Sequence, residues 1–300
     1  MIESFRQIIS RLKNMPRKKI CVAAGDESVL QTVRDALDEG IADAVLVGNR
    51  ENIWRMACRV SLNLNMVDII NVPDPEEAFY TAIKTVSSDN ADVLMEGTEC
   101  SEDFIKAVAS PAGLGLEKTV SCLAACEVPG FDRLIYVTDS GINEFPGFDE
   151  KVEILKNAVE FLYLMGIETP RVAVLSANEK VTPKMPVTVD AQMLADLYHS
   201  GALTGALVEG PVALDVAINK RAARQKGIND PVAANADLLL VPGVEAGNLM
   251  VRGIVQFARG RVASVLLGTK APVVLSDINQ TPEEKIYSLA LACYALLSKS

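Results

Sequence analysis

The stretch KICVAAGDESVLQTVRDALDEGIADAVLV, residues 19–47, carries the pattern of one complete strand–helix–strand unit. Residues 19–24 and 43–47 are short apolar runs, as in strands that are buried on both faces. Residues 28–39 between them have apolar side chains at helical spacing, and Gly40 follows, as at many helix ends. Two strands joined through a helix are expected to pair in parallel.

The same alternation continues along most of the chain and predicts a mostly parallel sheet with helices on both faces. The further predicted strands are 68–72, 92–95, 171–175, 205–208, 237–241, 261–267 and 272–275, and the further predicted helices are 51–60, 101–109, 150–165, 189–200, 214–225 and 248–258. Two more helices are expected to start at Asp74-Pro75-Glu76-Glu77 and Thr281-Pro282-Glu283-Glu284, because each stretch has a capping residue, a proline and a closing glutamate.

One region departs from the alternation. Residues 119–127 and 133–138 are two extended runs joined by Val128-Pro129-Gly130-Phe131-Asp132, which is a hairpin signal. An antiparallel pair inside a parallel pattern is typical of a domain boundary. We therefore expect an α/β fold of two lobes with a cleft between them, where ligands meet the carboxyl ends of the strands.

Composition and charge exclude several classes of protein. The chain has 29 basic and 39 acidic residues, and a net charge of −10 argues against a nucleic-acid partner. No run approaches the ~18 apolar residues of a membrane helix, so no membrane partner is expected. Residues 1–17 lack the apolar core of a secretory signal, and six scattered cysteines in mostly apolar runs suggest buried thiols; both favour the cytoplasm.

Common motifs for cofactors and nucleophiles are missing. No G-x-G-x-x-G follows a strand, no G-x-x-x-x-G-K-[ST] is present, and no H-E-x-x-H is present. Cys122 and Cys126 have no second cysteine pair or nearby histidine, so no metal site is expected. His199, the only histidine, is more simply a helix C-terminal cap than a member of a Ser-His-Asp triad.

Four loops that follow predicted strands carry the polar residues. The loop 96–101 enters the helix with Lys106, where backbone N–H groups are suited to an anion, although Ser101 can equally be an ordinary N-cap and Lys106 a solvated lysine. The loop 241–248 ends in Gly247 and Asn248, which suit a turn and a cap. The others are 276–280 and 178–190, and the lysines of the latter can meet phosphates or be solvated.

Together these loops resemble the phosphate acetyltransferase and phosphate butyryltransferase family. The motifs lie in the family's order over nearly the whole chain: Asp139–Asn143, Pro170–Ser176, Glu209–Asp215, Asn235-Ala236-Asp237, Pro242 and Glu245–Asn248. Further stretches resemble the butyryl branch more than the acetyl branch: Glu127–Gly130, Lys184-Met185-Pro186 and Val189-Asp190.

The resemblance implies a two-lobed fold like that of isocitrate dehydrogenase. Its first lobe would be discontinuous, 1–128 with 270–300, and its second lobe, 129–269, would carry the contacts of a homodimer. It also implies transfer of a short acyl group between coenzyme A and inorganic phosphate, with no metal and no cofactor, coenzyme A being a substrate. Both substrates would bind together, and the thiolate of coenzyme A would attack the acyl phosphate.

Site residues follow from the resemblance and the loops. Lys106 is expected to hold phosphate or the carbonyl oxygen, and Lys184 and the helix start at Asn248 to help bind the ligands. Glu284 falls where the acetyl branch has its proposed base, although a capping box with Thr281 explains it without catalysis. The other residues expected to line the substrates are Thr98, Ser101, Ser276, Asp277 and Ile278.

Positions 277 and 278 also depart from the family. The family often has a Ser-Arg pair there, whereas this chain has Asp277 and Ile278, and no Arg occurs from 263 to 300. Loss of a preorganised donor typically costs ~10²–10³ in rate. One hypothesis is an active phosphate acyltransferase for a short or branched chain. Its alternative is a catalytically impaired or repurposed paralogue that binds acyl-CoA or a phosphate ester. A decarboxylating dehydrogenase of the same fold lacks the expected aspartate cluster.

Overall fold

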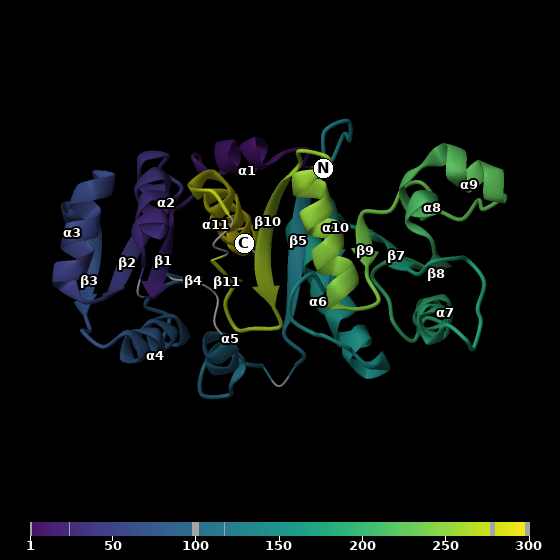
Figure 1. Cartoon of the computed structure of the whole chain (residues 1–300), viewed down its shortest axis with the longest axis horizontal. Helices are drawn as coiled ribbons and strands as arrows, with labels where there is room; N and C mark the ends of the chain where they lie inside the picture. Colours follow the sequence, from purple (N-terminus) through teal and green to yellow (C-terminus); the bar gives the residue numbers. More distant parts are fainter. Residues whose placement is uncertain (1, 24, 98–101, 117, 277–279, 298–300) are drawn as a thin grey trace. The chain divides into compact units, whose positions relative to one another are not determined.

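The computed structural model describes residues 2–23, 25–97, 102–116, 118–276 and 280–297 (Figure 1). It is mixed α/β with mostly parallel strands, which confirms the predicted class. The chain divides into two compact units: Ser4–Val120 with Val262–Ser300, and Met1–Glu3 with Ser121–Arg261. The predicted domain limits and the cleft stay predictions.

In the unit that starts at Ser4, the strand order is β3-β2-β1-β4-β11-β10. Pairing is parallel from β3 to β11, and β10 runs antiparallel to β11. The strands are β1 Lys18–Ala23, β2 Ala42–Gly48, β3 Val67–Asn71, β4 Val93–Glu96, β10 Arg261–Leu267 and β11 Val273–Val274. The chain runs outward from β1 to β3 and then returns to β4 on the other side of β1, so the strand order reverses between β1 and β4.

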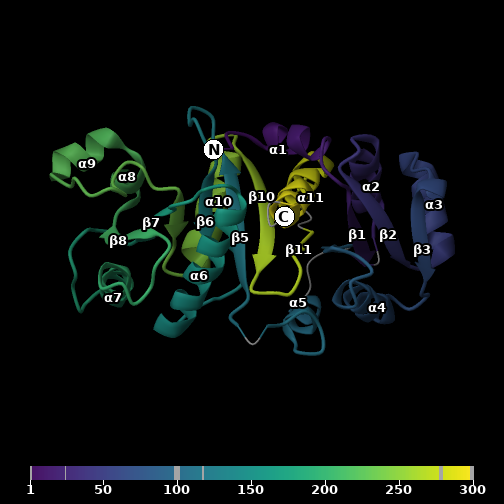
Figure 2. The same cartoon turned by 180° about the vertical axis from the view of Figure 1, so that it is seen from behind.

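The helices of this unit are α1 Phe5–Leu12, α2 Glu27–Asp38, α3 Arg50–Val60, α4 Pro75–Ser87, α5 Glu102–Ala109 and α11 Pro282–Leu297, with a short 3₁₀ turn η1 at Leu64–Met66. Asp74 caps α4, as predicted, because its Oδ1 accepts from the Glu77 N–H. Figures 1 and 2 show α2 and α3 on one side of β1–β3 and α4 on the other. Right-handed crossovers require this arrangement.

In the unit that contains Ser121–Arg261, the strand order is β5-β6-β9-β7-β8. β5 and β6 pair antiparallel, which confirms the predicted hairpin, and the remaining pairs are parallel. The strands are β5 Ser121–Glu127, β6 Ile135–Thr138, β7 Arg171–Leu175, β8 Leu207–Val212 and β9 Leu238–Leu240, and the helices are α6 Phe148–Leu164, α7 Pro186–His199, α8 Leu214–Ile218, α9 Lys220–Lys226 and α10 Val244–Gln256.

Two helix predictions in this unit are wrong. The single helix predicted over 214–225 is split into α8 and α9, because Asn219 is extended and its side chain accepts from the Arg221 N–H to cap α9. The helix predicted from Asn248 starts at Val244, after Gly243. Gly247 marks close packing rather than a turn: a Cβ there would lie 2.4 Å from the Asp139 carbonyl oxygen.

A buried ion cluster joins the amino ends of the parallel strands of this unit. Asp237 is 1% exposed and accepts hydrogen bonds from Arg171 Nε at 2.9 Å and Nη2 at 2.8 Å. Arg133 Nε lies 3.5 Å from the same carboxylate. Because a buried charge needs partners, the three side chains act as one structural unit.

No helix within the described ranges is both long enough and apolar enough to cross a membrane.

Candidate functional site

The carboxyl ends of β1 and β4 form the point in the first sheet where the strand order reverses. In open α/β sheets this is where ligands bind. The backbones are in contact there, since Asp26 N donates to Gly97 O at 2.7 Å. A Cβ on Gly97 would lie 1.9 Å from Ala23 O, so only glycine fits. The loop after β4 is thereby fixed against the loop after β1.

Glu96, the last residue of β4, has a fully buried side chain beside this point. Its Oε2 accepts from the Ser276 backbone N–H at 3.3 Å, which joins the ends of β4 and β11. Ser276 was predicted to line the substrates, and it is 2% exposed. The structure thus brings Ser276 to the carboxyl edge. Sequence analysis left Glu96 without a role; the signal was a charged residue directly after an apolar strand.

Lys106, the residue predicted to hold phosphate, lies on α5 and points into solvent. Its side chain is 71% exposed, and its Nζ lies 3.1 Å from Glu102 Oε2, one turn earlier on the same helix. Such exposed pairs contribute little to stability. Lys106 is therefore free to turn toward a ligand at small cost.

Glu284 has the local role that the capping box predicts. Its Oε2 accepts from Thr281 N at 2.8 Å and from Thr281 Oγ1 at 3.0 Å, and Glu284 N donates back to Thr281 Oγ1. Action as a base would require the carboxylate to leave these partners. The geometry favours the structural interpretation of Glu284.

The next residue, Lys285, was not selected from the sequence. It is 2% exposed, and its Nζ donates to Ser28 Oγ, in the first turn of α2, at 2.9 Å. Every residue of α11 from Lys285 to Ala295 is buried. The sequence pattern instead favours a partly solvated first turn, because a lysine lies in it. Burial of this side chain depends on packing between α11 and α2, which the sequence pattern does not encode.

In the other unit, Asp139 organises the carboxyl end of β6. The residue is 2% exposed; its Oδ1 accepts from the N–H groups of Cys122, Gly141 and Ile142, and its Oδ2 accepts from Asn143 N. A carboxylate bound by several N–H groups holds a tight loop. The motif Asp139–Asn143 is thus a loop built around its own first side chain.

The predicted ligand residues of this unit lie in different settings. Lys184 is exposed in the loop between β7 and α7. Asn248 is not a helix cap: it lies inside α10, where its Oδ1 accepts from Arg252 Nε at 2.8 Å. The prediction of a helix start at Asn248 is wrong, because Gly243 precedes the first turn.

Four predicted residues, Thr98, Ser101, Asp277 and Ile278, lie outside the described residues. Lys106, Glu284 and Ser276 belong to the unit that starts at Ser4, and Lys184 and Asn248 to the unit with Ser121–Arg261.

Four of the five described cysteines are buried, and their thiols are not suited to act as nucleophiles. Burial raises the pKa of Cys21, Cys122, Cys126 and Cys293 to about 12 in each case, so these thiols are protonated at neutral pH. Cys58 is exposed. No cluster of three or more metal-ligating side chains occurs in the parts of the chain that the structure describes.

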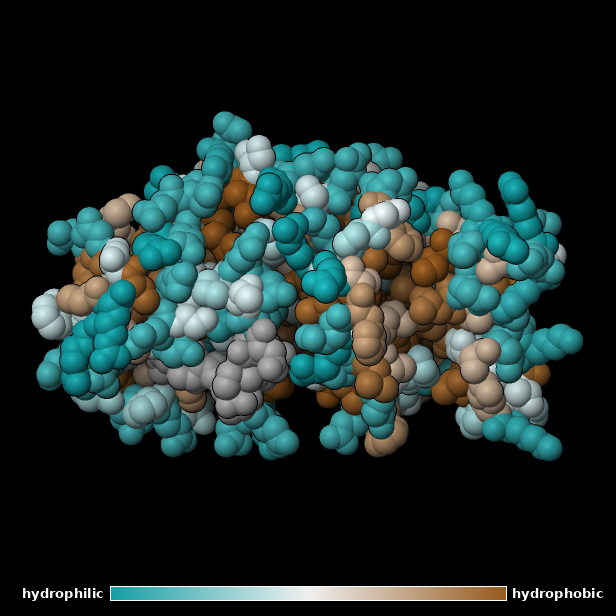
Figure 3. Space-filling model, turned by 45° about the horizontal axis from the view of Figure 1, so that its top comes forward, coloured by the Kyte–Doolittle hydropathy of each residue, from teal (hydrophilic) through white to brown (hydrophobic). Residues whose placement is uncertain are grey.

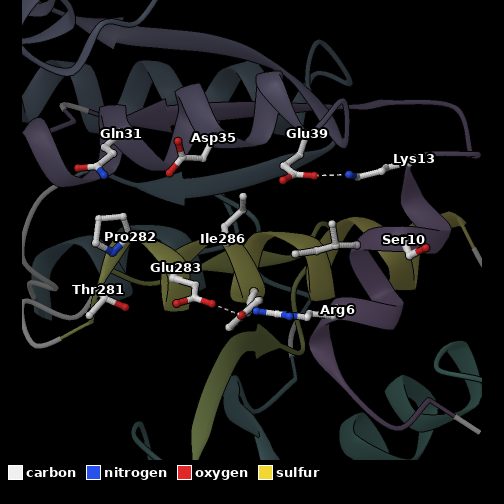
Figure 4. Close-up of a pocket in the computed structure, with 12 residues that line it drawn as sticks. Arg6, Ser10, Lys13, Gln31, Asp35, Glu39, Thr281, Pro282, Glu283 and Ile286 are labelled. Atoms are coloured by element: carbon white, nitrogen blue, oxygen red, sulfur yellow. Dashed lines mark hydrogen bonds and ion pairs between the residues drawn. The ribbon is translucent and has the colours of Figure 1, made fainter.

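A hollow of about 700 Å³ lies between α1, α2 and α11 (Figure 4). Its walls carry charges of both signs, with Arg6 and Lys13 from α1 and Asp35 and Glu39 from α2. Lys13 and Glu39 pair across it. None of the predicted site residues that are described lines this hollow.

Comparisons with known proteins agree with the loop motifs. The family model described as phosphate acetyl/butaryl transferase matches residues 74–293. Phosphate butyryltransferase of Clostridium acetobutylicum is 40% identical over 97% of this chain and 98% of its own length. Phosphate acetyltransferase of Thermotoga maritima is 36% identical over 95% of this chain and 97% of its own length.

Solved structures support the same relationship. A branched-chain phosphotransacylase from Enterococcus faecalis V583 matches with a TM-score of 0.84 and 27% identity, over 93% of this chain and 99% of that chain. A putative 4-hydroxythreonine-4-phosphate dehydrogenase from Salmonella typhimurium, 14% identical with a TM-score of 0.59 over 93% of this chain and 99% of that chain, shares the fold alone. The predicted dehydrogenase-like α/β fold is confirmed, and the chain belongs to the phosphate acetyltransferase and phosphate butyryltransferase family.

Proposed function

We propose that this protein exchanges a short acyl group, butyryl or a branched chain of similar length, between coenzyme A and orthophosphate. The observation that carries the proposal is the 40% identity to a phosphate butyryltransferase along 97% of the chain. The butyryl-like motifs at 127–130 and 184–190 favour an acyl chain longer than acetyl.

In the proposed reaction both substrates bind together. The sulfur of coenzyme A loses its proton and forms a bond to the carbonyl carbon of the acyl phosphate, and the carbon–oxygen bond to phosphate breaks. Acyl-CoA and orthophosphate are the products, and the reverse direction uses the same steps. No enzyme thiol is required, in keeping with the protonated state of the four buried cysteines.

The residue roles remain proposals. Lys106, exposed and weakly paired, is suited to close on phosphate or on the acyl oxygen. Lys184 offers an exposed positive charge, and Asn248 lies inside α10 rather than at its cap. Glu284 is the weaker candidate for thiol deprotonation because its carboxylate is held by Thr281. Thr98, Ser101 and Ser276 would complete the contacts to substrate.

The second candidate function is an impaired or repurposed family member that binds acyl-CoA or a phosphate ester. The replacement of the family's Ser-Arg pair by Asp277 and Ile278 favours it. The double variant Asp277→Ser with Ile278→Arg separates the two. A gain in the rate of acyl transfer of tenfold or more supports the first candidate, an acyltransferase whose site lacks one hydrogen-bond donor. An unchanged rate in a protein that binds acyl-CoA contradicts that placement of the pair.

Homodimer formation is also proposed, through α10. Among its residues only Gly247 is buried, Leu249 is 72% exposed, and Phe257 just beyond its end is 92% exposed. Figure 3 shows apolar atoms gathered over the part of the surface where α10 lies. Exposed apolar patches of this kind mark interfaces. Leu249→Asp should shift the mass in solution from dimer to monomer, whereas Trp54→Asp on α3 should not.

The direct test measures free thiol release from butyryl-CoA with and without orthophosphate. We expect phosphate-dependent release and a preference for butyryl-CoA over acetyl-CoA. One methylene is worth at most ~10–200-fold in discrimination. A purified, folded chain that binds butyryl-CoA but releases no coenzyme A would reject the transferase in favour of the second candidate.

A location in the reducing cytoplasm is also proposed, since the five described cysteines are free thiols.

A further inference from the structure

Lys285 is a buried cation without a counter-charge among the described residues. It is 2% exposed, and its ammonium donates to one neutral group, the hydroxyl of Ser28, at 2.9 Å. An ammonium has three hydrogens to donate. Burying a charge with only a hydroxyl partner is strongly unfavourable unless an anion binds it.

The nearby carboxylates do not supply that anion. Each acidic side chain at the starts of α2 and α11 is bound elsewhere: Asp26 to Val29 N, Glu27 to Arg59, Glu283 to the Tyr287 hydroxyl and Glu284 to Thr281. None of the four forms an ion pair with Lys285 in the described structure. The acidic side chains at these two helix starts therefore do not neutralise the charge of Lys285.

The surrounding backbone is also electropositive. Lys285 lies in the first turn of α11, and Ser28 lies in the first turn of α2, which is 12 residues long. A helix N-terminus carries a partial positive charge and destabilises a cation placed there. Two helix starts and an ammonium therefore meet at one place, an arrangement that favours an anion.

This place coincides with the reversal of strand order between β1 and β4. α2 begins directly after β1, and the loop after β1 is fixed to the end of β4 by the bond from Asp26 N to Gly97 O. Ligands of open α/β sheets bind at such positions. Two independent features, the sheet topology and the unbalanced buried charge, mark the same edge.

We propose that Lys285, with Ser28 and the first turn of α2, binds the phosphoryl group, as orthophosphate or as the phosphate end of the acyl phosphate. The assignment rests on the proposed function for the identity of the substrate, and on the geometry for the residue. Lys285 supplies a buried positive charge at this point of the sheet, and its burial strengthens the attraction to an anion.

The test compares Lys285→Met with Lys18→Met, a matched control in the same unit. Lys18 begins β1 at the opposite edge of the sheet and pairs with Asp92 at 3.0 Å. In Lys285→Met we expect the KM for orthophosphate to rise about tenfold to a hundredfold, as for loss of a charged hydrogen bond. The KM for butyryl-CoA should stay within threefold. Lys285→Arg should recover most of the phosphate affinity, and Lys18→Met should change neither KM.

Thermal unfolding gives a readout that a structural role would not produce. Without phosphate, Lys285→Met should unfold at or above the temperature of the unchanged protein, because an unbalanced buried charge has been removed. Its rise in unfolding temperature with added orthophosphate should be lost. A lower unfolding temperature with the phosphate effect intact overturns the assignment and makes Lys285 structural.

The two proposals fail differently. Acyl transfer with an unchanged phosphate KM in Lys285→Met overturns the inference and leaves the proposed function standing. Binding of orthophosphate that depends on Lys285, without acyl transfer, supports the inference and rejects the function. If Lys285→Met does not fold, hydrogen exchange of the unchanged protein decides: orthophosphate should protect the first turns of α2 and α11, and protection confined to other segments overturns the assignment.

Discussion

Replacing Asp139 by Asn should destabilise the unit that contains Ser121–Arg261. Oδ1 of Asp139 accepts three backbone N–H groups at 3.0–3.1 Å, and Oδ2 accepts Asn143 N at 3.0 Å. An amide can keep the three bonds to its oxygen, but its NH₂ group then faces the Asn143 N–H. Two charged bonds to Oδ2 are lost, because Asn143 Nδ2 also donates to it, and the NH₂ group then opposes these donors. At ~1.5–3 kcal/mol for a bond to a charged group, the expected cost is about 3–5 kcal/mol.

The assay is urea-induced unfolding followed by circular dichroism, with activity measured on the fraction that remains folded. Asp215→Asn is the matched control, because its carboxylate is 55% exposed, accepts one local bond from Val216 N and has only a long, exposed ion pair with Lys226 at 3.4 Å. We expect the control to stay within ~0.5 kcal/mol of the unchanged protein. A loss below 1 kcal/mol in Asp139→Asn would show that the carboxylate does not organise the loop 140–143.

Three further outcomes are expected. The pKa of a cysteine thiol is near 9 in the unfolded chain and about 12 for each of the four buried thiols. The free energy of unfolding should therefore fall as pH rises above 9, by about 1.4 kcal/mol per thiol at pH 10. Urea titrations measure this change, and a flat pH profile would contradict the burial of these thiols. Asp237→Ala removes the buried counter-charge shared by Arg171 and Arg133, and leaves Arg133 only the exposed carboxylate of Asp132; it should cost about 3–5 kcal/mol, measured by the same titrations, against little change in Asp132→Ala. Gly97→Ala should lower transfer activity at least tenfold, because its Cβ would lie 1.9 Å from Ala23 O. Unchanged kinetics would show that the loop after β4 takes no part in the site.

The alternation of strands and helices was predictable because buried parallel strands are continuous apolar runs and helices have their own spacing. Strand β10 and the start of α11 agree with the prediction for that reason. Helix α10 was misplaced because its first turn has no polar cap, and Asn248 and Gly247 imitate one. The break at Asn219 was missed because an asparagine inside a charged helical run carries no strong local signal.

The same distinction between local and long-range signals holds for the residues of the candidate site. Glu284 was explained by a motif within four residues, and the structure agrees. Glu96 and Lys285 were missed because their burial comes from elements far apart in the sequence, β11 against β4 and α11 against α2. Local patterns name the residues of a cap or a strand, whereas a buried charge is visible only after the chain has folded.

The most direct test of the whole account is turnover of butyryl-CoA by the purified chain. With orthophosphate present, we predict saturable release of coenzyme A together with stoichiometric formation of butyryl phosphate, and no release when phosphate is omitted. Tight binding of butyryl-CoA with no butyryl phosphate formed at any phosphate concentration would contradict acyl transfer as the function of this fold.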